Sequence, residues 1–407
     1  MTAADPRPWK GDAPAHPITV YADRSGSMAG FLDPAFPTRT DYRSVIDGLK
    51  ARLAPQQVYG FGTTVRRELR PDLGVMDDRA WYGDRNTETE QVLDSVAADA
   101  AHARTHLIVT DGRRSDPTRG YGQFERMRDV AQGWIRAGGS FVVAVSLAPF
   151  TPVKDDPSGC HVQRGERGQG AADEPEGAEG GGGLKCPLYV FAFAAPGDGM
   201  RVGATLAQLF DHVWMYPAPT APGKTFVLDQ DPATPGESAT FEHQRLLAAD
   251  SAAVAAVEGT EPATRPLRLH LRQPDTDSPA GRLVAALLAS GTRAELAARG
   301  VTSDSVAIDW MRQDGHTGAV RFLNSGRTLE VFSPGGDDCR AAPPSEPCGT
   351  LYRLELYPTG APAWLAELEA RDASDVERTF GLGRLFEPFR ANAAATPPLA
   401  RAYLMVR

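Results

Sequence analysis

The first half of the chain alternates short apolar segments with amphipathic helical segments, and this alternation limits the fold more than any other feature. Apolar segments such as 141–145 run without interruption, which is typical of strands that are covered on both faces. Strands that alternate with helices usually form a parallel sheet between two helical layers. The pattern therefore predicts an α/β fold over residues 15–214, a doubly wound, mostly parallel sheet with helices on both faces.

The predicted elements of this half follow from the same alternation. The predicted strands are 18–22, 57–63, 106–110, 141–147 and 188–192. The predicted helices are 42–53, 89–101, 124–137 and 202–212. Residues 66–70 could add an antiparallel edge strand. Ligands of such sheets bind beyond the carboxyl ends of the strands, so the residues that follow the strands are the first candidates for a site.

Oxygen-bearing side chains follow two of these strands. Asp23, Ser25 and Ser27 come directly after the first strand, and Asp111 follows the strand 106–110. Hard divalent cations such as Mg²⁺ prefer oxygen ligands and keep several water molecules. The sequence therefore predicts a site for a hard cation rather than for zinc or copper.

At these residues the chain resembles the von Willebrand factor A family. The metal-ion-dependent adhesion site of that family combines the pattern Asp-x-Ser-x-Ser, a threonine in a later loop and an aspartate after the fourth strand. The matching residues here are Asp23, Ser25, Ser27, Thr87 and Asp111. Thr89 is the rival for the threonine ligand. Thr87 is preferred because it stands six residues before the apolar helix residue Leu93, as in the family.

The resemblance implies a protein-binding module that depends on a divalent metal. Mg²⁺, or Mn²⁺ or Ca²⁺ in its place, would be held by the hydroxyls directly and by the carboxylates directly or through water. The open position of the ion would take the carboxylate of an Asp or Glu from a partner protein. Met28, Phe31 and Leu32 follow in the same loop. They either contact the partner beside the metal or fold back over the sheet.

Two other interpretations stay open. Bacterial proteins that resemble this family often act beside chaperone-like ATPases or in stress and defence gene clusters, so the chain could be an accessory or regulatory subunit of an ATPase or enzyme complex whose function lies in the carboxyl half. Alternatively, a metal could serve only to hold the loops together. Asp23, Thr87 and Asp111 also suit ordinary caps and turns.

Composition and missing motifs exclude several classes of protein. The formal net charge is −9, and the arginines are scattered, so the basic stripe that nucleic-acid binding requires is lacking. No run of about 18 apolar residues predicts a membrane span. Gly-x-Ser-x-Gly, His-Glu-x-x-His and the phosphate-binding glycine loop do not occur, and we expect no enzymatic activity. His102 and His106 have helical spacing, but His106 begins a predicted strand, and a structural role is expected for both.

The regular alternation of strands and helices does not continue through the insertion 151–185 or the second half of the chain. Residues 151–185 are rich in Gly, Glu, Asp and Pro and are predicted to be a flexible insertion in the first domain. Residues 215–407 are predicted to form a β-rich α+β domain of no recognisable family. Its predicted helices are 241–257 and 281–289, and its predicted strands are 267–271, 306–311, 319–323, 328–332, 351–357 and 402–406.

The four cysteines are predicted to form two local disulfides, Cys160 with Cys186 and Cys339 with Cys348, because each pair closes a short segment. Four free thiols in a cytosolic protein are the alternative. Disulfides favour an extracytoplasmic location. The first ten residues lack the apolar core of a signal peptide, so that location requires a leader that was removed; otherwise the cytoplasm is expected.

Overall fold

The structure is a computed structural model of the 407-residue chain. It describes residues 15–32, 40–68, 72–84, 86–99, 101–112, 122–151, 185–217, 227–230, 239–247, 252–259, 267–272, 279–290, 292–300, 311–313, 316–317, 320–323, 328–331, 350–358, 360–370, 379–391 and 398–406. These residues belong to two compact units. The first unit comprises Met1–Pro217 and Ala361–Phe389, and the second comprises Ala218–Gly360 and Arg390–Arg407.

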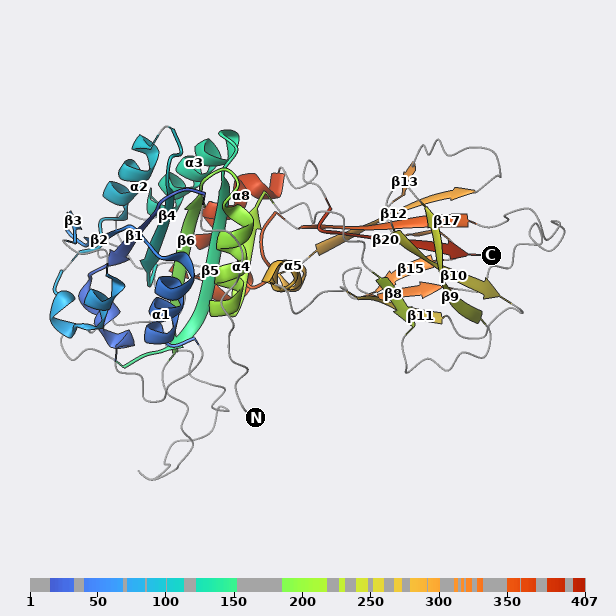
Figure 1. The fold of residues 1–407 in the computed structure, drawn as a ribbon, viewed down its shortest axis with the longest axis horizontal. Helices are drawn as coiled ribbons and strands as arrows, with labels where there is room; N and C mark the ends of the chain where they lie inside the picture. Colours follow the sequence, from blue (N-terminus) through green and yellow to red (C-terminus); the bar gives the residue numbers. More distant parts are fainter. Residues whose placement is uncertain are drawn as a thin grey trace, which may run out of the picture. The chain divides into compact units, whose positions relative to one another are not determined.

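A seven-stranded sheet with the order β3-β2-β1-β4-β6-β5-β7 forms the centre of the first unit (Figure 1). Its strands are β1 (Ile18–Asp23), β2 (Gln57–Phe61), β3 (Val65–Arg67), β4 (Thr105–Thr110), β5 (Ser140–Pro149), β6 (Lys185–Ala194) and β7 (His212–Tyr216). Residues 141–145 of β5 are all fully buried, so both faces of the sheet are covered. The predicted α/β class is confirmed.

Four helices of the first half pack in pairs against this sheet. They are α1 (Tyr42–Leu53), which contacts α4 (Gly199–Leu209), and α2 (Thr89–Ala98), which contacts α3 (Gly122–Arg136). In the described loops lie the short 3-10 helices η1 (Gly26–Phe31), η2 (Leu73–Asp77) and η3 (Arg79–Trp81). The helix α1 has the predicted bounds, and its start is fixed by Asp41, whose side chain accepts the N–H of Ser44 at 2.7 Å.

The sheet is mixed, so the prediction of a mostly parallel sheet is wrong. β1 runs parallel to β2 and β4, whereas every other neighbouring pair in the sheet is antiparallel, including the edge strand β3. Parallel neighbours need a crossover connection, but β6 lies beside β5 as its antiparallel neighbour and needs none. A strand that is buried on both faces is a continuous apolar run, whether it lies parallel or antiparallel to its neighbours. The sequence pattern therefore could not reveal the direction of β6.

Residues 361–389, here called the return segment, belong to the first unit, although the sequence predicted them within a domain of residues 215–407. The segment contains α7 (Leu365–Leu368), β18 (Glu369–Ala370), β19 (Thr379–Phe380) and most of α8 (Leu382–Ala391). Phe386 packs edge-on against Trp214 of β7, with ring centroids 4.9 Å apart. Side chains from α2, α3 and α8 share one hydrophobic core with β5.

Within its described residues, the second unit contains two sheets and one whole helix (Figure 1). The strand orders are β13-β12-β17-β20-β10-β9 and β14-β15-β16-β11-β8. The strands are β8 (Val227–Gln230), β9 (Ala239–Leu247), β10 (Ala252–Gly259), β11 (Leu267–Arg272), β12 (Thr292–Gly300), β13 (Met311–Gln313), β14 (His316–Thr317), β15 (Val320–Leu323), β16 (Thr328–Val331), β17 (Thr350–Pro358) and β20 (Ala400–Val406), and the helix is α5 (Pro279–Ala289). β8 contacts β10 and β20, so the two sheets lie against each other.

The predicted helix 241–257 is wrong, because this segment forms the antiparallel strands β9 and β10. Phe241 pairs with Val257, and His243 pairs with Ala255. The alanine-rich sequence favours a helix locally, but the pairing of β10 with β9 and β20 outweighs that propensity. The predicted helix 281–289 is present as α5. Of the predicted strand 306–311 only Met311 is described, and the predicted flexible insertion lies almost wholly outside the described residues.

Cys186 begins β6 together with Lys185, is fully buried and does not carry a free thiol. Cys160, Cys339 and Cys348 lie outside the described residues, so the two disulfide pairings stay predictions. Among the helices in the described ranges, none has both the length and the apolar character needed to cross a membrane.

The substitution Phe389→Ala is expected to destabilise the first unit by about 3–5 kcal/mol, because it removes a buried aromatic ring and leaves a cavity. Phe389 is 2% exposed and contacts the rings of Phe141, Trp214 and Tyr216. Hydrogen exchange measured peptide by peptide should be faster in β5 and unchanged in β17. Glu387→Ala, at an exposed position of the same helix, is the control and should change stability by less than about 0.5 kcal/mol. Equal loss of protection in both units would contradict the placement of the return segment.

Candidate metal centre

Three of the predicted ligands lie in one tight loop after β1. Asp23 is the last residue of that strand, and the N–H of Ser25 donates to its Oδ1 at 2.8 Å. The hydroxyl oxygens of Ser25 and Ser27 are 3.0 Å apart. Ser27 is already part of η1, whose tight turn brings it back beside Ser25. The local fold thus gathers one carboxylate and two hydroxyls at the carboxyl end of β1.

Asp111 lies next to this loop because β4 is a parallel neighbour of β1. The hydroxyl of Thr110 donates to Asp23 Oδ2 at 2.8 Å and accepts the N–H of Gly112 at 3.1 Å, so one hydroxyl joins the two strand ends. Gly112 has a φ of +73°, and a Cβ atom there would lie 2.9 Å from the ring of Tyr189. Both the backbone conformation and the lack of space therefore require glycine after Asp111.

Thr87 comes to the same edge of the sheet in the turn before α2. The N–H of the next residue, Glu88, donates to the carbonyl of Gly62 at 2.9 Å. Gly62 directly follows β2, the other parallel neighbour of β1. This bond holds the turn near the end of β1. Thr87 and its rival Thr89 are both buried, and Thr89 is the first residue of α2.

The two carboxylates of the site disfavour each other's negative charge. Burial raises the pKa of Asp23, the charge of Asp111 raises it further, and the result is a pKa of about 7 despite lowering hydrogen bonds from Ser25 and Thr110. A divalent cation between the carboxylates would remove this repulsion. Carboxylates and hydroxyls are also the oxygen donors that Mg²⁺ prefers, so the residues fit the metal that the sequence predicts.

The candidate ligands Asp23, Ser25, Ser27 and Asp111 are all buried. Asp23 is 0% exposed, Ser25 is 5% and Ser27 is 8%, while Asp111 is 3%. The two serines are thus slightly more exposed than the two aspartates. Within the described ranges, no group of three or more His, Cys, Asp or Glu side chains could hold a metal ion. The hydroxyls of Ser25 and Ser27 would add neutral oxygen ligands to the two carboxylates.

Met28, Phe31 and Leu32 are buried, and this decides between the two alternatives for these residues. Their exposures are 0%, 0% and 2%. The turn of η1 directs them inward, where the ring of Phe31 packs on Tyr42 and Phe150 at centroid distances of 6.0 and 5.1 Å. They fold back over the sheet, so the prediction that they contact a partner beside the metal is wrong.

No family model, curated protein or solved structure matches this chain. The resemblance to the von Willebrand factor A family thus depends on the five motif residues alone.

Sequence reasoning missed two hydroxyl pairs and one carboxylate next to the candidate ligands. The hydroxyls of Tyr42 and Tyr82 are 2.8 Å apart, and burial raises the pKa of both, with a smaller contribution from the charge of Asp23. The hydroxyl of Tyr189, opposite Thr110 in the sheet, lies 2.8 Å from that of Thr379 in the return segment. The third group is the carboxylate of Asp84. No local pattern marks any of these residues, because strands and turns distant in sequence bring them to the site.

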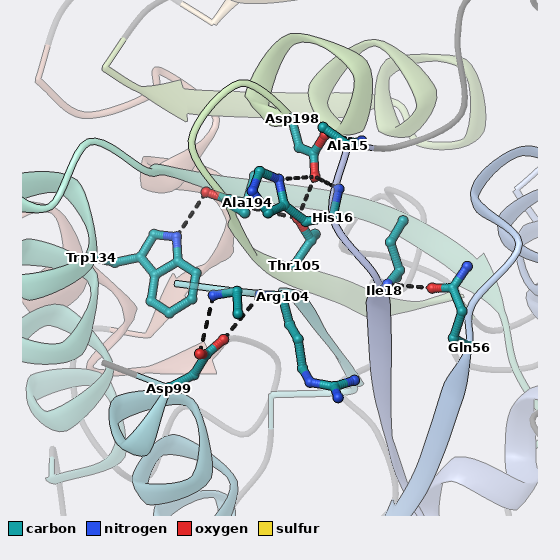
Figure 2. Close-up of polar contacts among 12 residues, drawn as sticks. Ala15, His16, Ile18, Gln56, Asp99, Arg104, Thr105, Trp134, Ala194 and Asp198 are labelled. Atoms are coloured by element: carbon teal, nitrogen blue, oxygen red, sulfur yellow. Dashed lines mark hydrogen bonds and ion pairs between the residues drawn. The ribbon is translucent and has the colours of Figure 1, made fainter. Parts of the chain in front are cut away.

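A separate polar network ties together the opposite edge of the sheet, where β1 and β4 begin (Figure 2). The carboxylate of Asp198 accepts the N–H of His16 and the hydroxyl of Thr105, each at 3.2 Å. Asp99 lies 3.1 Å from Nε2 of His106, and burial lowers the pKa of that histidine. These contacts fix the strand starts, which is the structural role that the sequence predicted for His106.

Proposed function

We propose that the first unit is a protein-binding module that depends on a divalent metal and captures an acidic side chain of a partner protein. Mg²⁺ would be held by Ser25, Ser27 and Thr87, and by Asp23 and Asp111 directly or through water. The observation that carries this proposal is the buried carboxylate pair of Asp23 and Asp111, whose charge repulsion a cation would relieve.

The neutral charge of the hydroxyl ligands supports the capture of a carboxylate. Hydroxyl oxygens are neutral, so an ion bound to them keeps more of its positive charge than one bound by carboxylates alone. Mg²⁺ also keeps water molecules that an outside ligand can replace. Ser25 and Ser27 are slightly more exposed than Asp23. A partner's carboxylate would therefore meet the ion on its hydroxyl side.

Calorimetric titration of the metal-stripped protein with Mg²⁺ and Mn²⁺ tests the metal centre. We expect one site in the wild type and none in the double variant Asp23→Ala, Ser25→Ala. The control is the double variant Asp47→Ala, Ser95→Ala, which removes the same side chains from exposed positions of α1 and α2 and should bind like the wild type. Absence of binding by the wild type would contradict the proposal.

The capture of a carboxylate can be tested with Mn²⁺ as a paramagnetic probe. A short blocked peptide with a single Asp should lower the water-proton relaxation of the Mn²⁺-loaded protein, because its carboxylate replaces a water on the ion. The same peptide with Asn in place of Asp should have no effect. Equal relaxation with both peptides would mean that the metal only holds the loops together.

A further inference from the structure

We propose that Asp84 is an additional member of the metal centre and that it holds the ion through a bound water molecule. This inference rests on the proposed function. Asp84 stands three residues before Thr87 and is not part of the five-residue motif. Its role follows from its position and from the surroundings of one carboxylate oxygen.

The backbone of Asp84 is bound to the loop that carries Ser25. The N–H of Gly26 donates to the carbonyl of Asp84 at 3.1 Å, and the N–H of Asp84 donates to the carbonyl of Arg24 at 3.2 Å. Ser25 and Asp84 thereby form an isolated parallel bridge. Asp84 is held directly beside the hydroxyl-bearing loop, although it comes 59 positions after Ser25 in the sequence.

The side chain of Asp84 lies over Gly62. A Cβ atom on Gly62 would lie 2.2 Å from Oδ2 and 2.6 Å from Cγ of Asp84, so only glycine leaves room for this carboxylate. The carbonyl of Gly62 also accepts the N–H of Glu88, the residue after Thr87. The carboxylate of Asp84 therefore lies between the Ser25 loop and the turn that presents Thr87.

One oxygen of Asp84 lacks a hydrogen-bond donor. Oδ2 is buried, and no donor in the described part of the chain reaches it. A buried carboxylate oxygen without a donor is unfavourable, and native proteins rarely leave one unexplained. A water molecule on a bound cation would supply the missing donor. A direct bond is disfavoured, because no three acidic side chains in the described ranges gather closely enough to hold one metal ion.

The substitution Asp84→Asn tests this role by two readouts. We expect the affinity for Mg²⁺ to fall about 10- to 100-fold, as is typical when a group that supports metal ligands is changed. The melting temperature of the metal-free protein should stay close to that of the wild type, because the amide has nearly the size of the carboxylate and the backbone bridge to Ser25 is unchanged, while the increase caused by Mg²⁺ should shrink. Asp47→Asn, at an exposed position of α1, is the control and should match the wild type in both readouts.

The variant Gly62→Ala tests the same role without removing the charge. Its methyl group would push the carboxylate of Asp84 aside, and Mg²⁺ affinity should again fall. Wild-type affinity in both variants would overturn the role of Asp84 and leave the proposed function intact. A lower melting temperature of metal-free Asp84→Asn with an unchanged Mg²⁺ effect would also overturn it, because Asp84 would then only stabilise the loop. If the wild type bound neither Mg²⁺ nor Mn²⁺, the proposed function would fail, and this inference with it.

Discussion

The variant Asp23→Asn is expected to lose Mg²⁺ binding and, at the same time, to be more stable than the wild type when both are free of metal at pH 8. The loss of affinity should exceed about 100-fold, because Asn cannot supply the negative charge that holds the ion. The gain in stability should be about 2–4 kcal/mol, because ionised Asp23 is buried beside the charge of Asp111 and its pKa is raised to about 7.

Asp23→Asn should lower the affinity for Mg²⁺ but raise the stability of the metal-free protein. A residue that only caps a loop would show no such combination, because its substitution would lower stability. The amide oxygen of Asn can still accept the N–H of Ser25, and its amide nitrogen can donate to the hydroxyl of Thr110, which has a second lone pair. The loop can therefore keep its shape. Chemical denaturation of the metal-free proteins at pH 8, followed by circular dichroism, measures the stability difference.

The experiment needs a control variant, and one result would contradict the prediction for Asp23→Asn. Asp47→Asn removes a carboxylate from an exposed position of α1 and should leave both metal affinity and stability close to those of the wild type. A metal-free Asp23→Asn protein that is clearly less stable than the wild type would show that the carboxylate of Asp23 serves the loop itself. In that case the charge repulsion with Asp111 would not be the dominant property of the site.

The parts of the fold that depend on local pattern could be predicted from the sequence. The strand 18–22 and the helix 42–53 follow from apolar spacing, and the structure has them with almost the same bounds. The neighbouring strands β1 and β4 run parallel, so the residues after them necessarily meet at one edge. This is why Asp23 and Asp111 could be placed together before any coordinates were known.

The parts that depend on long-range packing could not be predicted. The apolar sequence of β6 fits either strand direction, and the return segment has no local signal that assigns Phe386 to one unit rather than the other. The segment 28–32 is short and apolar, which suits both exposure at a binding surface and burial against the rest of the first unit. A backbone bridge to Ser25 brings Asp84 to the site, and no periodic pattern in the sequence indicates such an isolated bridge.

The affinity for Mg²⁺ is expected to increase about tenfold for each pH unit between pH 5 and pH 7 and to level off above pH 7. The pKa of Asp23 is raised from its ordinary value of 3.8 to about 7, first by burial and then by the charge of Asp111. The folded metal-free protein therefore keeps a proton on Asp23 in a pH range where the unfolded chain has lost it. By this linkage, the metal-free protein should lose stability as pH rises from about 4 to about 7, and Mg²⁺ must displace the proton in order to bind.

Calorimetry at pH 6 in two non-chelating buffers with different ionisation enthalpies measures this displacement, and close to one proton should be released for each Mg²⁺ bound. Thr110→Val removes a hydrogen bond that lowers the pKa of Asp23, so the rise in affinity should move to higher pH, and Thr110→Ser should restore it. An affinity that does not change between pH 5 and pH 7 would mean that Asp23 is already ionised in the folded protein. The carboxylate pair would then not be the feature that draws a cation to this edge of the sheet.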